Sequence, residues 1–192
     1  EHATAVTAVL FTECIETCIV VGHSMGGYVA LALAEKQPDM VGGLVLFHST
    51  SYPDLAEKKI DRERVIALVQ RNKSVYLNAA IPSLFAENSK TGLQNEIQSV
   101  IHIANGFSDQ GIIANIRGMM ERKDRTEILK DGKFRKLIIH GELDSVISTD
   151  DVKKIAALSN DIELQMVKNI SHMGHLEAPE KCFNLIAEFC RD

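Results

Sequence analysis

The stretch from residue 19 to residue 27 limits what this chain can fold into more than any other part of the sequence. Residues 19–21 form a β-branched run, Ile-Val-Val, which is typical of a buried strand. The run ends at Gly22, and the apolar residues that follow Ser24 have the spacing of an amphipathic helix. A strand that turns into a helix within three residues forces the residue at the apex into strained backbone geometry. We therefore predict that Ser24 lies exposed on a sharp bend.

Two glycines flank this serine, Gly22 before it and Gly26 after it. Because glycine has no side chain, we expect both positions to allow the close approach of strand and helix that the bend requires. A serine at a helix N-terminus faces free N–H groups and the positive end of the helix dipole, which favour developing negative charge. The pattern predicts a nucleophile at Ser24, and the alternative is a serine that only caps the helix.

Length and composition exclude several classes of protein. The chain has 192 residues, of which 45% are hydrophobic and 24% charged, and this suits one domain with a substantial core. A net charge of −5 without a polybasic cluster argues against nucleic acid or an anionic membrane surface as a partner. No apolar run approaches the roughly 20 residues that span a bilayer, and the four cysteines form no C-x-x-C pair. We expect free thiols, no metal, and a reducing, cytoplasmic setting.

The order of the remaining patterns predicts an α/β core with one long insertion. A second buried strand at residues 42–48 completes a strand–helix–strand unit, which implies a parallel sheet with a right-handed crossover. Residues 51–120 then carry three amphipathic helical patterns and no strand signal. Because this segment is far longer than a crossover requires, we expect a helical cap at 51–120, with the core formed by 1–50 and 121–192. Ordinary crossover helices are the alternative.

Two further strands are each followed by a residue that could assist a nucleophilic serine. Asp144 follows the strand predicted at 136–141, and His172 follows the strand predicted at 162–167. A serine needs a base to take its proton and an acid to orient that base. Since ligands bind at the carboxyl ends of parallel strands, we expect both side chains to lie near Ser24.

Three segments in this order, Gly22–Gly27, Gly141–Asp144 and His172–Glu180, together resemble motifs of the α/β-hydrolase family. The resemblance is greatest to esterase-like members with a helical cap, and it covers nearly the whole chain. It implies a mostly parallel sheet with flanking helices. Ser171 stands where a glycine commonly precedes the histidine in relatives, which is a mild departure.

The resemblance also implies residue roles. Ser24 is expected as the nucleophile, His172 as the base and Asp144 as the acid that orients it. The backbone N–H of Met25, the residue after the nucleophile, is expected to contribute to the oxyanion hole. No cofactor and no metal are implied.

Other polar residues receive less specific interpretations. Glu142 is the alternative acid, and His175 is the alternative base. His23 is interpreted as a packed or hydrogen-bonded histidine beside the bend. His48, at the end of the second strand, is interpreted as a structural histidine, with a place in the lining of the pocket as the alternative. The mixed-charge run at residues 121–125 predicts a solvated helix surface.

The main departure from the family concerns the start of the chain. Family members have several strands ahead of the serine bend, and one of their loops supplies a second oxyanion N–H. Here only a short segment precedes Ser24, so the fold is expected to be N-terminally truncated. The strand before Ser24 would then be an exposed sheet edge, which favours pairing or aggregation. We expect a missing N-terminal segment or another chain, as in an oligomer, to cover this edge.

The sequence thus predicts a serine hydrolase that cleaves carboxylic esters or related acyl compounds through an acyl-enzyme, with a small-molecule acyl substrate. The same residues serve lactonases, C–C hydrolases, amidases, acyltransferases and perhydrolases, and the fold does not decide among them. The alternative from another class is a non-catalytic binder or receptor on the same scaffold.

Overall fold

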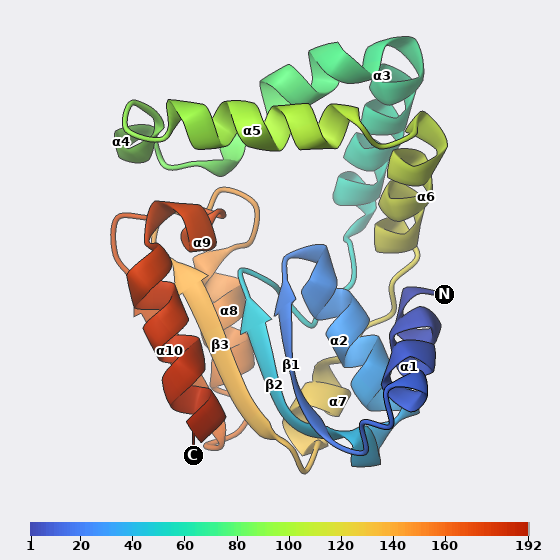
Figure 1. Cartoon of the computed structure of the whole chain (residues 1–192), viewed down its shortest axis with the longest axis vertical. Coiled ribbons are helices and arrows are strands. Elements are labelled where there is room, and N and C mark those ends of the chain that lie inside the picture. Colours follow the sequence, from blue (N-terminus) through green and yellow to red (C-terminus); the bar gives the residue numbers. More distant parts are fainter. Residues whose placement is uncertain (192) are drawn as a thin grey trace.

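Four parallel strands form the centre of this computed structural model, which describes residues 1–191 (Figure 1). They lie in the order β1-β2-β3-β4, with bounds Cys18–His23, Val41–Phe47, Arg135–Gly141 and Ile162–Val167. Each neighbouring pair is parallel, and the pairing places Val21 beside Val45 and Leu46 beside Ile138. The parallel sheet and the four predicted strands are confirmed.

Helices cover both faces of this sheet because its strands are apolar on both sides. Leu44 and Leu46 of β2 face a cluster built with α1 (His2–Thr12), α2 (Met25–Lys36), α7 (Thr126–Asp131) and α8 (Thr149–Ala156). Val45 and Phe47 face the opposite cluster, which α10 (Pro179–Arg191) completes. This alternation is the two-residue period of a strand that is buried on both faces. A 3-10 turn, η1 (Pro38–Met40), leads from α2 into β2.

The segment between β2 and β3 is helical throughout its regular structure. It contains α3 (Ala56–Ala80), η2 (Pro82–Leu84), α4 (Glu87–Lys90), α5 (Gln94–Asn105) and α6 (Asp109–Met120). These helices lie beyond the carboxyl ends of the strands (Figure 1). They pack into two small cores of their own, one around Leu77 and Ile101 and one around Val69 and Ile116. None of the helices in residues 1–191 has the length and apolarity needed to cross a membrane.

The border of the sheet at β1 is open. Within residues 1–191, no strand pairs with β1 on the side opposite β2. Val21 in the middle of β1 is 43% exposed, although its β-branched side chain is of the kind usually buried. The open border of β1 is the sheet edge expected from the sequence.

Candidate active site

The bend at Ser24 has the strained geometry that the sequence predicts. Ser24 lies between the end of β1 and the start of α2, with φ 51° and ψ −117°. A Cβ atom at Gly22 would lie 2.5 Å from the carbonyl oxygen of Gly26, so only glycine fits there. The prediction for Gly26 is wrong, because a Cβ at that position meets no described atom within 4 Å. The tight position on the helix is Gly27, where a Cβ would collide with the side chain of Ser49.

The start of α2 supplies free hydrogen-bond donors next to the serine. The helix begins at Met25, and the first N–H groups of an α-helix have no acceptor within the helix. The positive end of the helix dipole lies at the same point. A negatively charged oxygen formed beside Ser24 would therefore be stabilised by α2.

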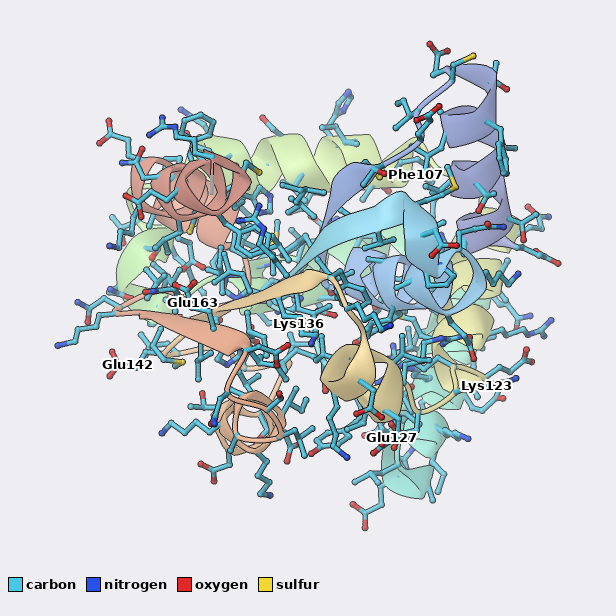
Figure 2. The ribbon with its side chains drawn as sticks, turned by 90° about the horizontal axis from the view of Figure 1, so that it is seen from below. Phe107, Lys123, Glu127, Lys136, Glu142 and Glu163 are labelled. Atoms are coloured by element: carbon cyan, nitrogen blue, oxygen red, sulfur yellow. The ribbon has the colours of Figure 1, made fainter. Side chains whose placement is uncertain are left out.

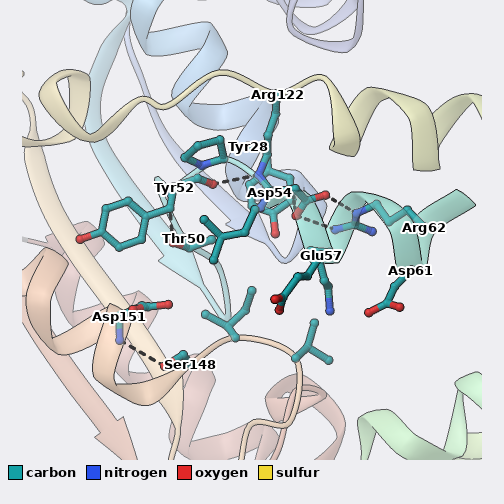
Figure 3. Close-up of a pocket in the computed structure, with 15 residues that line it drawn as sticks. Tyr28, Thr50, Tyr52, Asp54, Glu57, Asp61, Arg62, Arg122, Ser148 and Asp151 are labelled. Carbon is teal, nitrogen blue, oxygen red and sulfur yellow. Dashed lines mark hydrogen bonds and ion pairs between the residues drawn. The ribbon is translucent and has the colours of Figure 1, made fainter.

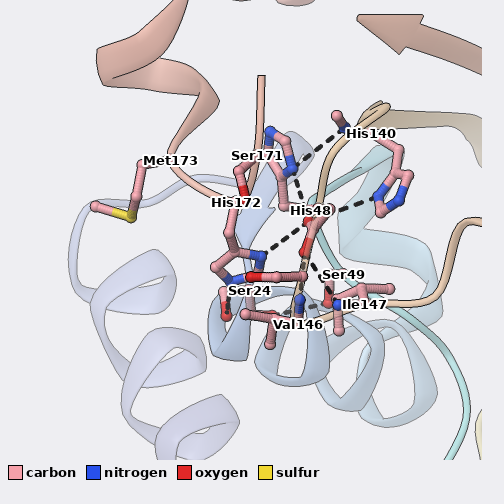
Figure 4. Close-up of polar contacts among 12 residues, drawn as sticks. Ser24, His48, Ser49, His140, Val146, Ile147, Ser171, His172 and Met173 are labelled. Carbon is pink, nitrogen blue, oxygen red and sulfur yellow. Dashed lines mark hydrogen bonds and ion pairs between the residues drawn. The ribbon is translucent and has the colours of Figure 1, made fainter. Parts of the chain in front are cut away.

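The structure brings the three predicted side chains together in one hydrogen-bonded chain (Figure 4). Ser24 Oγ lies 2.8 Å from His172 Nε2, and His172 Nδ1 lies 2.9 Å from Asp144 Oδ2. The three residues follow β1, β3 and β4, and parallel strands place their carboxyl ends at the same edge. With Nδ1–H donating to the carboxylate, the lone pair of Nε2 faces the serine hydroxyl, as a general base requires.

Asp144 is buried but fully supplied with donors. Its Oδ1 accepts from the backbone N–H of Val146 at 2.8 Å and of Ile147 at 3.0 Å. Its Oδ2 accepts from His172 and also from His48 Nδ1, at 3.0 Å. Burial alone would raise the pKa of this carboxyl, but the hydrogen bonds from His172 and His48 outweigh it and hold the pKa well below its usual range. The carboxylate is therefore ionised at neutral pH.

His48 is a member of the site that the sequence interpretation missed. It follows β2 directly, has φ 48°, and its side chain is completely buried. The structure therefore confirms its burial but adds a contact with Asp144 (Figure 4). The sequence signal that could have revealed this contact is the position of His48 directly after a strand. Since the ends of β2 and β3 lie side by side, residues that follow these two strands can meet. Nearby, His140 Nδ1 is 3.7 Å from Asp144 Oδ2, while its Nε2 lies 3.3 Å from Thr149 Oγ1.

Two further histidines lie around the base. His23 Nε2–H donates to the carbonyl oxygen of His172 at 2.8 Å, so His23 is hydrogen-bonded as predicted. Burial lowers the pKa of His23 to about 4, which keeps its ring neutral at neutral pH. His175 stacks edge-on against His23, with 4.8 Å between ring centroids, and burial also lowers its pKa. Of His172 and His175, it is His172 that contacts Ser24.

The alternative acid, Glu142, is exposed and lies at the periphery of the molecule (Figure 2). Its neighbour Asp144 makes the contact with His172 instead. The choice between the two carboxylates made from the sequence therefore agrees with the geometry.

Glu177 fixes the loop that carries His172. Its Oε2 accepts from the backbone N–H of Ser171 at 2.9 Å and of Met173 at 3.2 Å. Its Oε1 accepts from the N–H of Ala86 at 2.7 Å, and the N–H of His172 donates to the carbonyl oxygen of Leu84 at 3.0 Å. The loop of His172 is thereby bonded directly to the helical segment between β2 and β3.

A cavity of about 300 Å³ lies between the sheet end and α3 (Figure 3). Tyr28, one helical turn after Ser24, lines it together with a buried ion-pair group. Within that group, Asp54 binds Arg62, and its Oδ1 lies 2.7 Å from Arg122 Nη1. The prediction of a solvated helix surface at residues 121–125 is confirmed only in part. Glu121, Lys123 and Asp124 are exposed, but the run is not helical and the Arg122 side chain is only 8% exposed.

Within residues 1–191, His48, His140 and Asp144 form the group whose nitrogen and oxygen atoms are close enough to share a metal ion, all within 4.8 Å. Asp144 Oδ2 already accepts hydrogen bonds from His48 and His172. These contacts are the ones expected of a hydrogen-bond network around a carboxylate.

Comparison with known proteins agrees with this geometry. A sequence profile of the family described as serine aminopeptidase, S33, matches residues 3–179. The chain is 23% identical over 197 residues to an uncharacterized hydrolase, YugF, of Bacillus subtilis, covering 93% of this chain and 65% of that protein. It is 24% identical over 194 residues to the pimeloyl-[acyl-carrier protein] methyl ester esterase of Nitrosospira multiformis, covering 91% of this chain and 68% of that protein.

The fold matches solved structures as well. A thermophilic esterase from Thermogutta terrifontis superimposes with a TM-score of 0.91 at 26% identity, over 98% of this chain and 70% of that one. The chain thus spans about two-thirds of the length of the curated relatives it matches, 65% of one and 68% of another. The family profile matches nearly the whole chain, and the sheet carries a serine bend at the expected strand end. The chain therefore belongs to the serine aminopeptidase S33 family of α/β-hydrolases.

Proposed function

We propose that this chain carries the catalytic centre of a serine hydrolase for carboxylic esters or related acyl compounds. The observation that carries the proposal is the unbroken chain of contacts from Ser24 Oγ through His172 to Asp144, at 2.8 and 2.9 Å. Both distances are within hydrogen-bond range, as the transfer of the serine proton requires.

In the proposed reaction, His172 Nε2 takes the proton of Ser24 as the serine oxygen attacks the carbonyl carbon. The negative charge that develops on the carbonyl oxygen is stabilised by the N–H of Met25 and the dipole of α2. His172 then gives the proton to the leaving alcohol, and an acyl-enzyme remains. Water, activated by the same imidazole, attacks the acyl carbon and releases the acid. Asp144 stays ionised throughout and stabilises the imidazolium.

Two similarities support an ester as the substrate. The relative from Nitrosospira multiformis is named a methyl ester esterase, and the structure from Thermogutta terrifontis is named an esterase. We propose that helices α3 to α6 form a cap over Ser24, with the cavity beside Tyr28 as space for part of the substrate.

A reactive probe and a serine variant test the proposal together. We expect a fluorophosphonate to label Ser24 in the folded protein, and Ser24→Ala to lose both labelling and hydrolysis of a short p-nitrophenyl ester. Ser99→Ala, at an exposed position on α5, is the matched control and should retain both. Equal labelling of Ser24→Ala and the unchanged chain would reject the proposal. A folded chain without any labelling would favour a non-catalytic binder.

A further inference from the structure

The carboxylate of Asp144 is shared between two imidazoles at the same oxygen. His172 Nδ1 lies 2.9 Å from Oδ2, and His48 Nδ1 lies 3.0 Å from the same atom. The side chains of Asp144 and His48 are both completely buried. The mechanism proposed above uses the contact with His172 and leaves His48 without a role.

The surroundings of His48 determine which of its nitrogens carries the proton. Its Nε2 is buried, has no hydrogen-bond partner among the described residues, and packs against Gly174. A proton on Nε2 would leave a buried donor unsatisfied and would point the lone pair of Nδ1 at the carboxylate. The backbone N–H of Gly141 also points at Nδ1, but at 3.4 Å this contact is long. A proton on Nδ1 instead gives the ionised Asp144 a donor at 3.0 Å, which is the stronger of the two hydrogen bonds, and leaves Nε2 as an unpaired acceptor. The neutral ring therefore carries its proton on Nδ1.

We propose that His48 is a positioning residue, which holds the carboxylate of Asp144 and takes up part of its charge, and so weakens the hold of that carboxylate on a proton of His172. The inference rests on the function proposed above. Hydrogen bonds to a carboxylate stabilise its charged form and make it a weaker partner for a second cation. Without the His48 donor, more of the charge of Asp144 would be available to stabilise the protonated ring of His172.

The other groups around His172 are two imidazoles and one carboxylate. His23 faces it from β1 and His175 from α9 (Gly174–Glu177), while Glu177 binds the backbone of its loop. His140 on β3 is as buried as His48, but its Nδ1 is 3.7 Å from Asp144 Oδ2 and makes no hydrogen bond there. His140 is therefore a matched control for the loss of a buried imidazole.

The experiment follows the titration of His172 by NMR in histidine-labelled protein, with the signal assigned by its loss in His172→Ala. His48→Leu removes the donor, while His48→Asn keeps an N–H near the position of Nδ1 and tolerates positive φ. We expect the midpoint of His172 to rise by about half a pH unit to one in His48→Leu. It should stay within about 0.2 units of the unchanged protein in His48→Asn and in His140→Leu.

An unchanged midpoint in folded His48→Leu would overturn the inference, and so would an equal rise in His140→Leu. If His48→Leu does not fold, nitrogen chemical shifts of the unchanged protein decide the question, since they report which nitrogen of His48 is protonated. Protonation at Nδ1 supports the inference, and protonation at Nε2 refutes it. Because the titration needs no turnover, a midpoint shift without fluorophosphonate labelling of Ser24 would reject only the proposed function.

Discussion

We expect acidification to destabilise this protein well before its carboxylates are neutralised. His23 and His140 are buried, and burial lowers the pKa of each to about 4. In the unfolded chain both rings have the ordinary pKa of histidine, about 6.5. Between these two values the unfolded chain binds more protons than the folded one, so the free energy of unfolding falls as the pH falls.

The magnitude follows from the size of the two shifts. A difference of about 2.5 pKa units corresponds to about 3 kcal/mol per ring once the pH is below both values. From about pH 7 to about pH 5, the loss is about 2 kcal/mol for each ring and about 4 kcal/mol for the pair. Asp144 adds nothing in this window, because a carboxyl with a depressed pKa contributes stability that is lost only below its unfolded value, about 3.8.

Urea unfolding at a series of pH values measures this dependence. The unchanged protein is compared with His140→Leu, which lacks the contribution of His140 and should lose about 2 kcal/mol less over the same interval. The comparison uses the change with pH within each protein, so a packing defect in the variant cancels. If His140→Leu loses as much stability as the unchanged protein between about pH 7 and about pH 5, the buried neutral ring of His140 is not a source of the pH dependence.

Four further predictions concern packing, an ion pair and a thiol. Gly22→Ala places a Cβ 2.5 Å from the Gly26 carbonyl oxygen, and we expect a loss of about 1–3 kcal/mol in urea unfolding. Gly26→Ala, where the space is open, should be neutral or gain up to about 1 kcal/mol. Arg122→Ala leaves buried Asp54 with one cation, so unfolding should become easier by about 2–4 kcal/mol, and a loss below about 1 kcal/mol would contradict the ion-pair argument. Burial raises the pKa of Cys182 to about 11, so it should react with a disulfide reagent only after unfolding, whereas the exposed thiols react at once.

The strands and helices could be predicted from the sequence because, in this fold, the local residue pattern agrees with the burial of each element. The run at residues 19–21 is apolar and forms part of β1, where Ile19 and Val20 pack against the cores on opposite faces of the sheet. Ser148 has the residue type and spacing of a helix cap, and the Asp151 N–H donates to its Oγ at 3.3 Å at the start of α8. Such signals depend on neighbours in the chain, which a sequence displays directly.

The features that were missed depend on contacts between distant residues. The mixed-charge run at residues 121–125 has the composition of a solvated surface, but Asp54, far away in the chain, draws Arg122 into the interior. His48 has the composition of a buried structural residue, and only its register beside β3 brings it to Asp144. Gly26 fits the motif, yet the close packing occurs one residue later, at Gly27. Each of these depends on the arrangement of strands and helices in space.

The bonds around Glu177 and Leu84 have a consequence for access to the serine. The peptide of His172 is fastened to Leu84, and Glu177 is fastened to Ala86, so the loop and this part of the helical segment form one piece. If a substrate entered by lifting residues 82–86 with these bonds intact, the loop of His172 would move with that segment. The imidazole would then be drawn away from Ser24. Admission and proton transfer would then alternate, and the base would return to the serine only after the opening had closed behind the substrate.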